Sequence, residues 1–140
     1  PIGAVMTQGK AVGLLGAGSH GSTYGGTVLG SRVVYTVLDT LEKENAVANA
    51  ATVGAYIVDQ LREQLAGCNV QVRGFGMMIG IQLPKDCAEL VAIARDQYKL
   101  IINVTAGSVV RLLPPLNMTQ AQADELLQRL VPAIQNFLKA

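Results

Sequence analysis

The sequence predicts an α+β fold in which helices cover a small, antiparallel sheet. Three observations lead to this prediction. The first half of the chain repeats apolar residues at helical spacing, the middle alternates apolar and polar residues at strand spacing, and the end forms another apolar helical stripe. The chain has 140 residues, of which 50% are hydrophobic, so it is long enough to bury a real core.

The first half of the chain contains a glycine-rich start followed by two helical patterns. Residues 1–19 mix apolar side chains with five glycines, which predicts a short strand and a connection whose order depends on neighbouring structure. Apolar residues then share one helical face from Val28 to Leu41 and again from Val47 to Leu65. This spacing predicts helices over 26–43 and 45–66, separated at Glu44-Asn45.

Two strands and a helix are expected next. Val70 and Val72 alternate with polar residues, and Met77 to Leu83 alternates again after the glycine turn at 74–76. Asp86 and Glu89 have the spacing of a capping box, which predicts a helix that begins there and continues through Tyr98.

The last third of the chain predicts a hairpin and a helix. The runs 100–105 and 108–113 are rich in β-forming residues and are separated by Ala106-Gly107. Pro114-Pro115 cannot extend a ladder of hydrogen bonds, so the second strand should stop just after Arg111. Thr119 and Gln122 then cap an amphipathic helix. The complete order is two helices followed by ββαββα.

Composition excludes several classes of partner and site. Eleven basic and ten acidic residues give a formal charge of +1, and the scattered lysines provide no basic patch for nucleic acid. No apolar run reaches the length of a membrane span, and no signal peptide is present at the start, so we expect a cytoplasmic protein without a membrane partner. Cys68 and Cys87 lack further cysteine or histidine neighbours, which indicates two reduced thiols and no metal site.

The turn His20-Gly21-Ser22-Thr23-Tyr24-Gly25-Gly26 is the first candidate binding site. Its glycines permit a sharp bend that gathers amide groups, and the hydroxyls of Ser22 and Thr23 add donors. A helix begins soon afterwards, so its positive N-terminal end favours a phosphate or a carboxylate. From these residues alone, a simple helix cap remains an alternative. For His20 we favour a structural role over a catalytic one.

Arg111 is the second candidate. Strand alternation places it on the same face as Val109 and Leu113, where a guanidinium group needs a partner for its charge. Two partners remain open: a carboxylate of a bound molecule, or one of the acidic residues of the chain. Arg73 lies beside the glycine turn at 74–76, and a structural role is favoured for it.

Four separated motifs resemble class III aminotransferases that depend on pyridoxal 5'-phosphate. They are Pro1-Ile2-Gly3-Ala4, His20 to Gly26, Arg73-Gly74-Phe75-Gly76-Met77-Met78-Ile79-Gly80 and Val109-Val110-Arg111-Leu112-Leu113-Pro114-Pro115-Leu116. Their order matches the acetylornithine branch of that family, and the resemblance runs from end to end. It implies the C-terminal part of a PLP-dependent transferase fold, which is α/β in the complete enzyme. Residues 1–43 would be the end of the large domain and a linking helix, and residues 44–140 the small domain.

The resemblance also implies roles for three residues. Thr23 matches the residue that contacts the cofactor phosphate of the neighbouring subunit, which implies a homodimer whose sites are shared across the interface. Ser22 matches a position that approaches both cofactor and substrate. Arg111 matches the arginine that holds the α-carboxylate of the substrate. The implied substrates are N-acetylornithine, 2-oxoglutarate and glutamate.

Two features set this chain apart from the family pattern. After Gly26 the family usually has Asn-Pro-Leu, whereas this chain has Thr27-Val28-Leu29, so the proline that would set the helix start is absent. The resemblance also places the Schiff-base lysine shortly before Pro1. The chain would then be part of a longer polypeptide, would contain no catalytic residue and would be inactive alone.

Two other functions remain open at this point. One is a non-catalytic α+β module that binds an amino acid through Arg111 and the glycine turns, as regulatory domains do. The other is a purely structural dimerisation module, because residues 1–43 are too apolar and glycine-rich to fold unaided.

Overall fold

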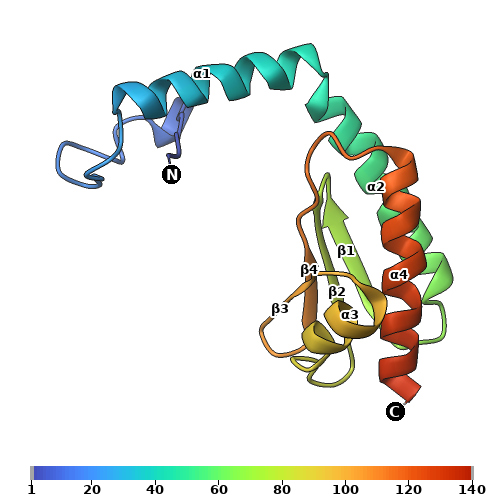
Figure 1. Cartoon of the computed structure of the whole chain (residues 1–140). Helices are drawn as coiled ribbons and strands as arrows, with labels where there is room; N and C mark the ends of the chain where they lie inside the picture. The colour runs from blue at the N-terminus through green and yellow to red at the C-terminus, as the bar shows by residue number, and fades with distance from the viewer. Residues whose placement is uncertain (1, 140) are drawn as a thin grey trace. The chain divides into compact units, whose positions relative to one another are not determined.

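The computed structural model describes residues 2–139, so Pro1 of the first motif lies outside the described residues. These residues form two compact units, which divide after Glu44 (Figure 1). The predicted order of two helices followed by ββαββα is confirmed, with one additional short 3-10 helix near the start.

The first unit contains the 3-10 helix η1 (Gly9–Ala11) and the helix α1 (Val28–Lys43). The strand predicted within residues 1–19 is wrong, because residues 2–8 have no regular secondary structure and the following residues contain only η1, turns and bends. Gly9, Gly13 and Gly18 have φ angles of 59°, 83° and 82°, which a strand does not accommodate. No residue between Ile2 and Glu44 is buried.

The start of α1 shows how the chain replaces the absent proline. Thr27 is the N-cap, and its hydroxyl accepts a hydrogen bond from the backbone N–H of Gly30 at 3.3 Å. A side chain at position 30 would disturb this cap, since a Cβ built on Gly30 would lie 3.0 Å from Thr27 Oγ1. The helix therefore begins at Val28, two residues later than the sequence predicts.

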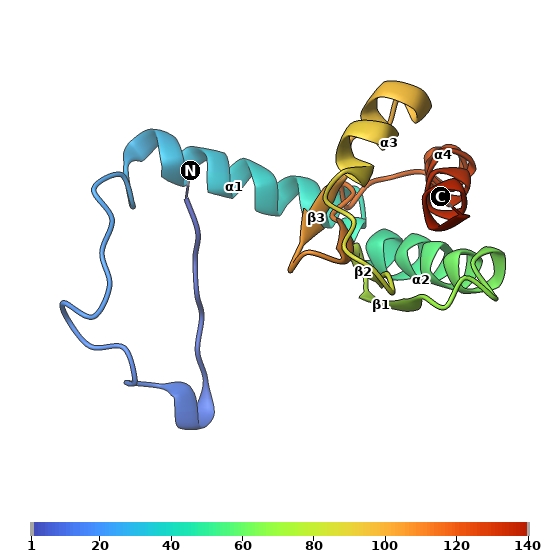
Figure 2. The same cartoon turned by 90° about the horizontal axis from the view of Figure 1, so that it is seen from below.

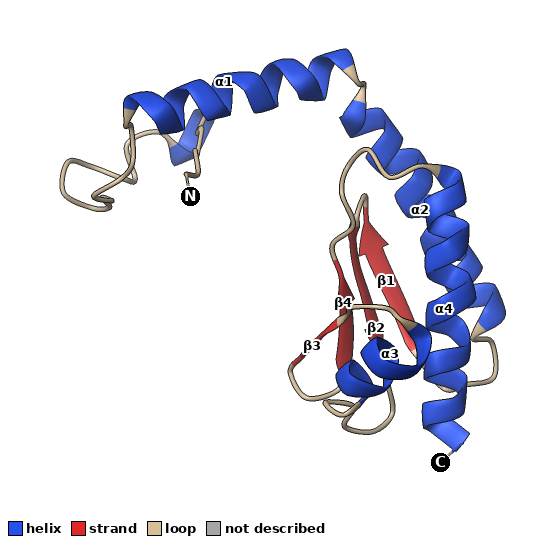
Figure 3. Ribbon diagram, viewed as in Figure 1, coloured by secondary structure: helices blue, strands red, loops and turns tan. Residues whose placement is uncertain are grey.

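The second unit contains a four-stranded sheet and three helices. The strands are β1 (Gln71–Phe75), β2 (Met78–Gln82), β3 (Asn103–Thr105) and β4 (Val109–Leu112), and the helices are α2 (Ala46–Gln64), α3 (Leu90–Tyr98) and α4 (Gln120–Lys139). The strand order is β1-β2-β4-β3, with every pair antiparallel. Within this unit the three helices lie on one face of the sheet, as Figures 2 and 3 show. The other face, which we call the open face, carries none of them.

The core lies between the sheet and these helices, as the alternation in the sequence predicts. On β2 and its flanks, Met77, Ile79, Ile81 and Leu83 are buried. Apolar residues of α2 and α4 complete the core, among them Ile57, Leu61, Leu127, Leu130, Ile134 and Phe137. No helix within residues 2–139 has both the length and the apolar character needed to cross a membrane.

A close approach of α2 to the β1–β2 turn fixes the position of the glycine motif. A Cβ built on Gly54 would lie 2.1 Å from the carbonyl oxygen of Gly76, and one built on Gly74 would lie 2.8 Å from a methyl group of Val58. Only glycine fits at these two positions without movement of the backbone or the neighbouring side chain. The turn is therefore held directly against the helix.

The capping box predicted at Asp86 and Glu89 is wrong. α3 begins at Leu90, and its N-cap Glu89 makes no side-chain cap hydrogen bond. The backbone organises this segment instead, because the N–H of Cys87 donates to the carbonyl of Gly107 at 2.9 Å.

The predicted hairpin turn, the end of β4 and the cap of α4 hold, whereas the strand expected over 100–105 begins only at Asn103. Ala106 and Gly107 have φ angles of 50° and 75°, as a two-residue hairpin turn requires, and β4 ends at Leu112. At the start of α4, Thr119 and Gln122 form a reciprocal capping box: the Gln122 N–H donates to the Thr119 hydroxyl at 3.3 Å, and the Thr119 N–H donates to the Gln122 side chain at 2.9 Å.

Candidate functional site

The hydroxyl residues of the first motif form an exposed turn just before α1. Ser22 and Thr23 are exposed, and the Ser22 carbonyl accepts a hydrogen bond from the Gly25 N–H at 3.3 Å, which closes the turn. Gly26 follows with a φ of 76°, and Thr27 then begins the helix. The chain thus places two hydroxyls on a turn that precedes the N-terminus of α1 by a few residues.

The charges around this turn suit an anion. Residues 1–38 contain no aspartate or glutamate, so the first acidic residue of the chain is Asp39. Small hydroxyls, flexible glycines and a helix N-terminus are groups that bind phosphate in proteins. The side chains present therefore fit the phosphate of a cofactor such as pyridoxal 5'-phosphate.

His20 lies at the head of the turn and is exposed. Among residues 2–139 its ring makes no hydrogen bond, so the structural role that the sequence favours has no visible partner there. Nothing in the described structure links it to the two hydroxyls.

Arg111 lies in β4, on the open face of the sheet. The residues on either side of it in sequence, Val110 and Leu112, are buried toward the helices, whereas Arg111 itself is exposed. Of the two partners that the sequence leaves open, the internal salt bridge is absent within residues 2–139. The guanidinium group is therefore available to a carboxylate from outside the described structure.

Arg111 lines a hollow of about 410 Å³ at the end of the sheet. Its other walls include Asn103, which is opposite Arg111 in the β3–β4 register, and the apolar residues Ile101, Leu113 and Pro114. A charged group beside an apolar wall and a side-chain amide matches the needs of a small carboxylate with a carbon chain.

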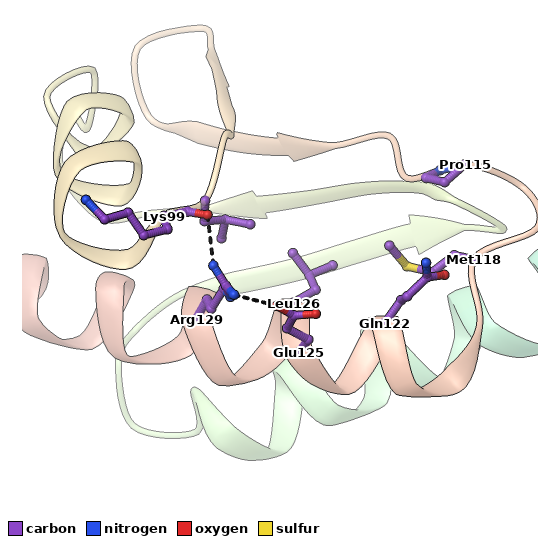
Figure 4. A pocket seen from close by; sticks show the side chains of 8 residues that line it. Lys99, Pro115, Met118, Gln122, Glu125, Leu126 and Arg129 are labelled. Carbon is purple, nitrogen blue, oxygen red and sulfur yellow. Dashed lines mark hydrogen bonds and ion pairs between the residues drawn. The ribbon is translucent and has the colours of Figure 1, made fainter.

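Arg129, unlike Arg111, is held by hydrogen bonds and an ion pair within the chain. It lines a neighbouring hollow of about 280 Å³ (Figure 4), where it donates to the backbone carbonyls of Lys99 and Tyr98 at 3.0 and 3.4 Å. It also forms an ion pair with Glu125 on its own helix. Because its donors close the C-terminal end of α3, Arg129 is a structural residue, in contrast to Arg111.

The structure brings some of the sequence-predicted residues together within each unit. Ser22 and Thr23 share one turn of the first unit, and Arg111 belongs to the second. The assignment of Ser22 and Thr23 to the cofactor and of Ser22 and Arg111 to the substrate stays a prediction.

Strand pairing adds two candidate site residues, Arg73 and Asn103, to those that the sequence predicts. Arg73 pairs with Gly80, Gly80 pairs with Arg111, and Arg111 pairs with Asn103, so these four residues form one row across the sheet. Sequence alone assigned Arg73 a structural role and gave Asn103 none. The hairpin turn could have predicted the pairing of Asn103 with Arg111, but no local pattern predicts the pairing of β2 with β4.

The two thiols differ in their environment. Cys68 is half-buried and Cys87 is fully buried, and both are free. Burial, and the adjacent carboxylate of Asp86, raise the pKa of the Cys87 thiol. Cys87 is therefore an unreactive core residue at neutral pH. Within the described range, no three histidine, cysteine or acidic side chains gather as metal ligands.

Comparison with known proteins gives consistent similarities. The sequence model of the family "Aminotransferase class-III" matches residues 1–134. The chain is 44% identical over 140 residues to acetylornithine aminotransferase 1 of Bordetella parapertussis, covering 99% of this chain and 35% of that protein. It is 40% identical over 142 residues to the acetylornithine aminotransferase of Nitrosomonas europaea, covering 100% of this chain and 36% of that protein.

Solved structures agree. The ornithine δ-aminotransferase of Plasmodium falciparum superposes with a TM-score of 0.78 at 32% identity, over 89% of this chain and 34% of that one. The chain thus spans about a third of the length of the proteins that it matches. The similarity confirms the predicted fold, the C-terminal part of a PLP-dependent transferase.

Proposed function

Because the chain belongs to the class III aminotransferase family, we propose that it is the C-terminal portion of an enzyme that moves an amino group between N-acetylornithine and 2-oxoglutarate. The observation that carries this proposal is the exposed, unpaired Arg111 on the open face, within a chain whose relatives in Bordetella and Nitrosomonas are acetylornithine aminotransferases. The family and its solved neighbours imply pyridoxal 5'-phosphate as the cofactor.

In this proposal Arg111 holds the carboxylate of the substrate. A guanidinium group presents a planar fork of donors that matches the two oxygens of a carboxylate. Holding the α-carboxylate of 2-oxoglutarate fixes the orientation of the adjacent keto carbon, which receives the amino group, so the contribution of Arg111 is positioning and not proton transfer. The apolar wall of the hollow excludes water around this ion pair and strengthens it.

Ser22 and Thr23 serve the cofactor and the substrate. The Thr23 hydroxyl donates to the cofactor phosphate of the partner subunit in a homodimer, and Ser22 contacts both the cofactor and the substrate. When bound, pyridoxal 5'-phosphate supplies the electron sink for amino-group transfer. The geometry of the exposed turn, the nearby helix N-terminus and the absence of acidic residues before Asp39 support this assignment.

We further propose that the lysine that bonds to the cofactor is supplied from outside this chain, which would then be inactive alone. Three of the five lysines in this chain already contact a residue of their own unit. Lys43 pairs with Asp39, Lys99 donates to the Asp96 carbonyl, and Lys85 lies 4.6 Å from the centre of the Phe137 ring. Under this proposal residues 1–43 end the large domain and residues 44–140 form the small domain of a cytoplasmic enzyme.

The cofactor role is tested with Thr23→Val in the complete enzyme. The variant should weaken cofactor binding by about 1–3 kcal/mol, because the phosphate loses a donor. Titration of the apoenzyme, followed by cofactor absorbance, measures this. Thr36→Val is the matched control, since the Thr36 hydroxyl bonds only to the Arg32 carbonyl of its own helix. Equal affinity of Thr23→Val and the wild type would exclude the phosphate contact.

The substrate role is tested with Arg111→Lys. An ammonium group cannot reproduce the planar fork, so the Michaelis constants for N-acetylornithine and 2-oxoglutarate should both rise. Arg95→Lys is the control, because Arg95 is exposed on α3 and pairs with Asp96. Unchanged Michaelis constants in Arg111→Lys would remove this residue from the site, and a wild-type enzyme without amino transfer would refute the function itself.

A further inference from the structure

Residues 113–118, which connect β4 with α4, form a wall of the hollow that contains Arg111. Leu113, Pro114 and Met118 line that hollow, whose volume is about 410 Å³. Leu113 and Pro114 also line a larger, mainly apolar hollow of about 710 Å³, together with residues of α2 and the β1–β2 turn. The segment thus separates two hollows, so its position determines how much space remains beside Arg111.

This segment depends on another element for part of its hydrogen bonding. Pro114 and Pro115 have no backbone N–H and cannot donate. The Met118 N–H donates to the Pro115 carbonyl at 3.0 Å, which forms a turn. The carbonyl groups of Leu116 and Met118 receive their donors from α2. The course of the segment is therefore set by the helix on which it lies.

Asn49, in the first turn of α2, supplies both donors. Its side-chain nitrogen lies 2.8 Å from the carbonyl oxygen of Leu116 and 3.0 Å from that of Met118. An amide nitrogen carries two hydrogens, so it donates one to each carbonyl. Asn49 is half-buried, and it lies 67 and 69 positions before these two residues. One side chain therefore clamps the end of the segment to α2.

The clamp acts on the segment more than on the packing of the helices. α2 and α4 are also joined by their apolar core residues and by the Tyr56 hydroxyl, which donates to Asp124 at 2.7 Å. Both helices thus keep their place without Asn49. Met118, by contrast, lines both the Arg111 hollow and the neighbouring hollow drawn in Figure 4. Loss of the clamp should therefore alter the hollows before it alters the core.

We propose that Asn49 is a positioning residue for the substrate, because it holds the wall beside Arg111. This inference rests on the proposed function, in which that hollow receives the α-carboxylate of 2-oxoglutarate. With the clamp closed, Leu113 and Pro114 keep water from the ion pair between Arg111 and the carboxylate, which strengthens the pair. With the clamp open, the segment shifts toward the larger hollow, water enters and the carboxylate is bound less tightly. Asn49 itself contacts neither the substrate nor the cofactor.

The kinetic test compares Asn49→Ala and Asn49→Asp in the complete enzyme with the control Gln135→Ala. Asn49→Ala should raise the Michaelis constant for 2-oxoglutarate about 5- to 100-fold, the range expected for two lost hydrogen bonds. Asn49→Asp should raise it further, because a carboxylate repels the two carbonyl oxygens that it faces, while an acidic residue still suits the first turn of a helix. Cofactor affinity should equal that of the wild type in all three variants.

The control separates this role from simple stabilisation. Gln135 of α4 donates to the carbonyl of Gln64, at the other end of α2, at 2.9 Å. Gln135→Ala should lower the midpoint of thermal unfolding, as Asn49→Ala does, but leave the Michaelis constant for 2-oxoglutarate unchanged. A purely structural Asn49 would behave in the same way as Gln135.

A second measurement uses the present chain and needs no activity. The amide NMR signals of Arg111, Leu113 and Met118 should shift in Asn49→Ala, because the segment moves. The same three signals should keep their wild-type positions in Gln135→Ala.

Two outcomes would overturn the inference and leave the proposed function intact. Unchanged NMR signals in Asn49→Ala would show that the amide does not hold the segment. Shifted signals with an unchanged Michaelis constant would show that the wall does not influence substrate binding. If the wild-type enzyme transfers no amino group, the proposed function fails and the role of Asn49 in substrate binding fails with it, whereas the NMR comparison still decides whether the clamp exists.

Discussion

Both units of this chain are rich in apolar residues, but only the second unit buries its apolar side chains in a core. In the second unit the apolar faces of α2 and α4 close over the sheet and form one core. In the first unit the apolar residues of α1 remain exposed, including Val28 at 89%, Leu29 at 77% and Leu38 at 58%. An amphipathic helix is stabilised mainly by the surface on which it packs. The second unit therefore carries most of the packing that stabilises the described residues, whereas the apolar face of α1 has no packing surface within the first unit.

This difference agrees with the distribution of the candidate sites. Ser22 and Thr23 lie in the unit without a core, on a turn that precedes an exposed helix. Arg111 lies on a strand whose neighbours in sequence are buried. The candidate residue Arg111 thus lies on a strand that is supported by the core, whereas the turn with Ser22 and Thr23 has no such support within its own unit.

The largest expected difference between the units is the cost of removing a leucine side chain. Leu61→Ala in α2 should destabilise the chain by about 2–5 kcal/mol, because Leu61 is fully buried and its loss leaves a cavity. Leu38→Ala in α1 should change the free energy of unfolding by less than about 0.5 kcal/mol. Urea denaturation followed by circular dichroism measures both. Similar losses in the two variants would mean that α1 is packed as tightly as α2.

A matched pair of glycines sharpens the comparison. Gly54→Ala should cost about 1–3 kcal/mol, because the new methyl group would meet the Gly76 carbonyl oxygen at 2.1 Å and push α2 from the turn. Gly21→Ala in the first unit has no atom within 4 Å of the new methyl group and should be nearly neutral. The same denaturation experiment compares them. A neutral Gly54→Ala would contradict the close approach of helix and turn.

Two threonine caps provide a smaller contrast. Thr119→Ala removes the capping box of α4 and should lower the free energy of unfolding by about 1 kcal/mol, since α4 is part of the core. Thr27→Ala removes the cap of α1 and should increase fraying of that helix without changing the unfolding midpoint. Amide hydrogen exchange of α1, together with urea denaturation, distinguishes the two responses. A shifted midpoint in Thr27→Ala would show that α1 unfolds together with the core.

The smallest expected effect is a loss of stability at alkaline pH, which arises from two groups of the second unit. Burial raises the pKa of the Cys87 thiol, and the hydrogen bond from the Tyr56 hydroxyl to Asp124, 2.7 Å long, raises the pKa of Tyr56. A pKa raised by folding stabilises the protein fully below the unfolded-state pKa, and this contribution is lost as pH rises through the folded-state pKa. Stability should therefore decline above about pH 9, the ordinary range of a thiol.

The variants Cys87→Ala and Tyr56→Phe test this pH dependence. Urea midpoints measured at pH 7 and at pH 10 should differ less in either variant than in the wild type. Cys68, which is half-buried, supplies the control Cys68→Ala, whose pH dependence should equal that of the wild type. If all three variants and the wild type respond alike, other groups govern the alkaline loss.

Local patterns in the sequence determined the helices, the strands and most of their ends. The apolar spacing between Val28 and Leu65 requires helices, the alternation from Met77 to Leu83 requires a strand, and Ala106-Gly107 requires a tight turn. The failures were also local. The strand expected before residue 19 conflicts with three glycines of positive φ, and the cap expected at Asp86 is replaced by a backbone contact with Gly107.

For the candidate site, sequence alone selected Ser22, Thr23 and Arg111, through motifs and the chemistry of their side chains. It also determined that the chain is a class III aminotransferase segment, because four motifs in a fixed order carry that information without any structure. Only the tertiary structure decided that Arg111 is exposed and unpaired, and that Arg73 lies across Gly80 from it. The physical reason is that this row depends on the pairing of β2 with β4. Pairing of segments about thirty residues apart follows from the packing of a shared core and leaves no periodic signal in either segment.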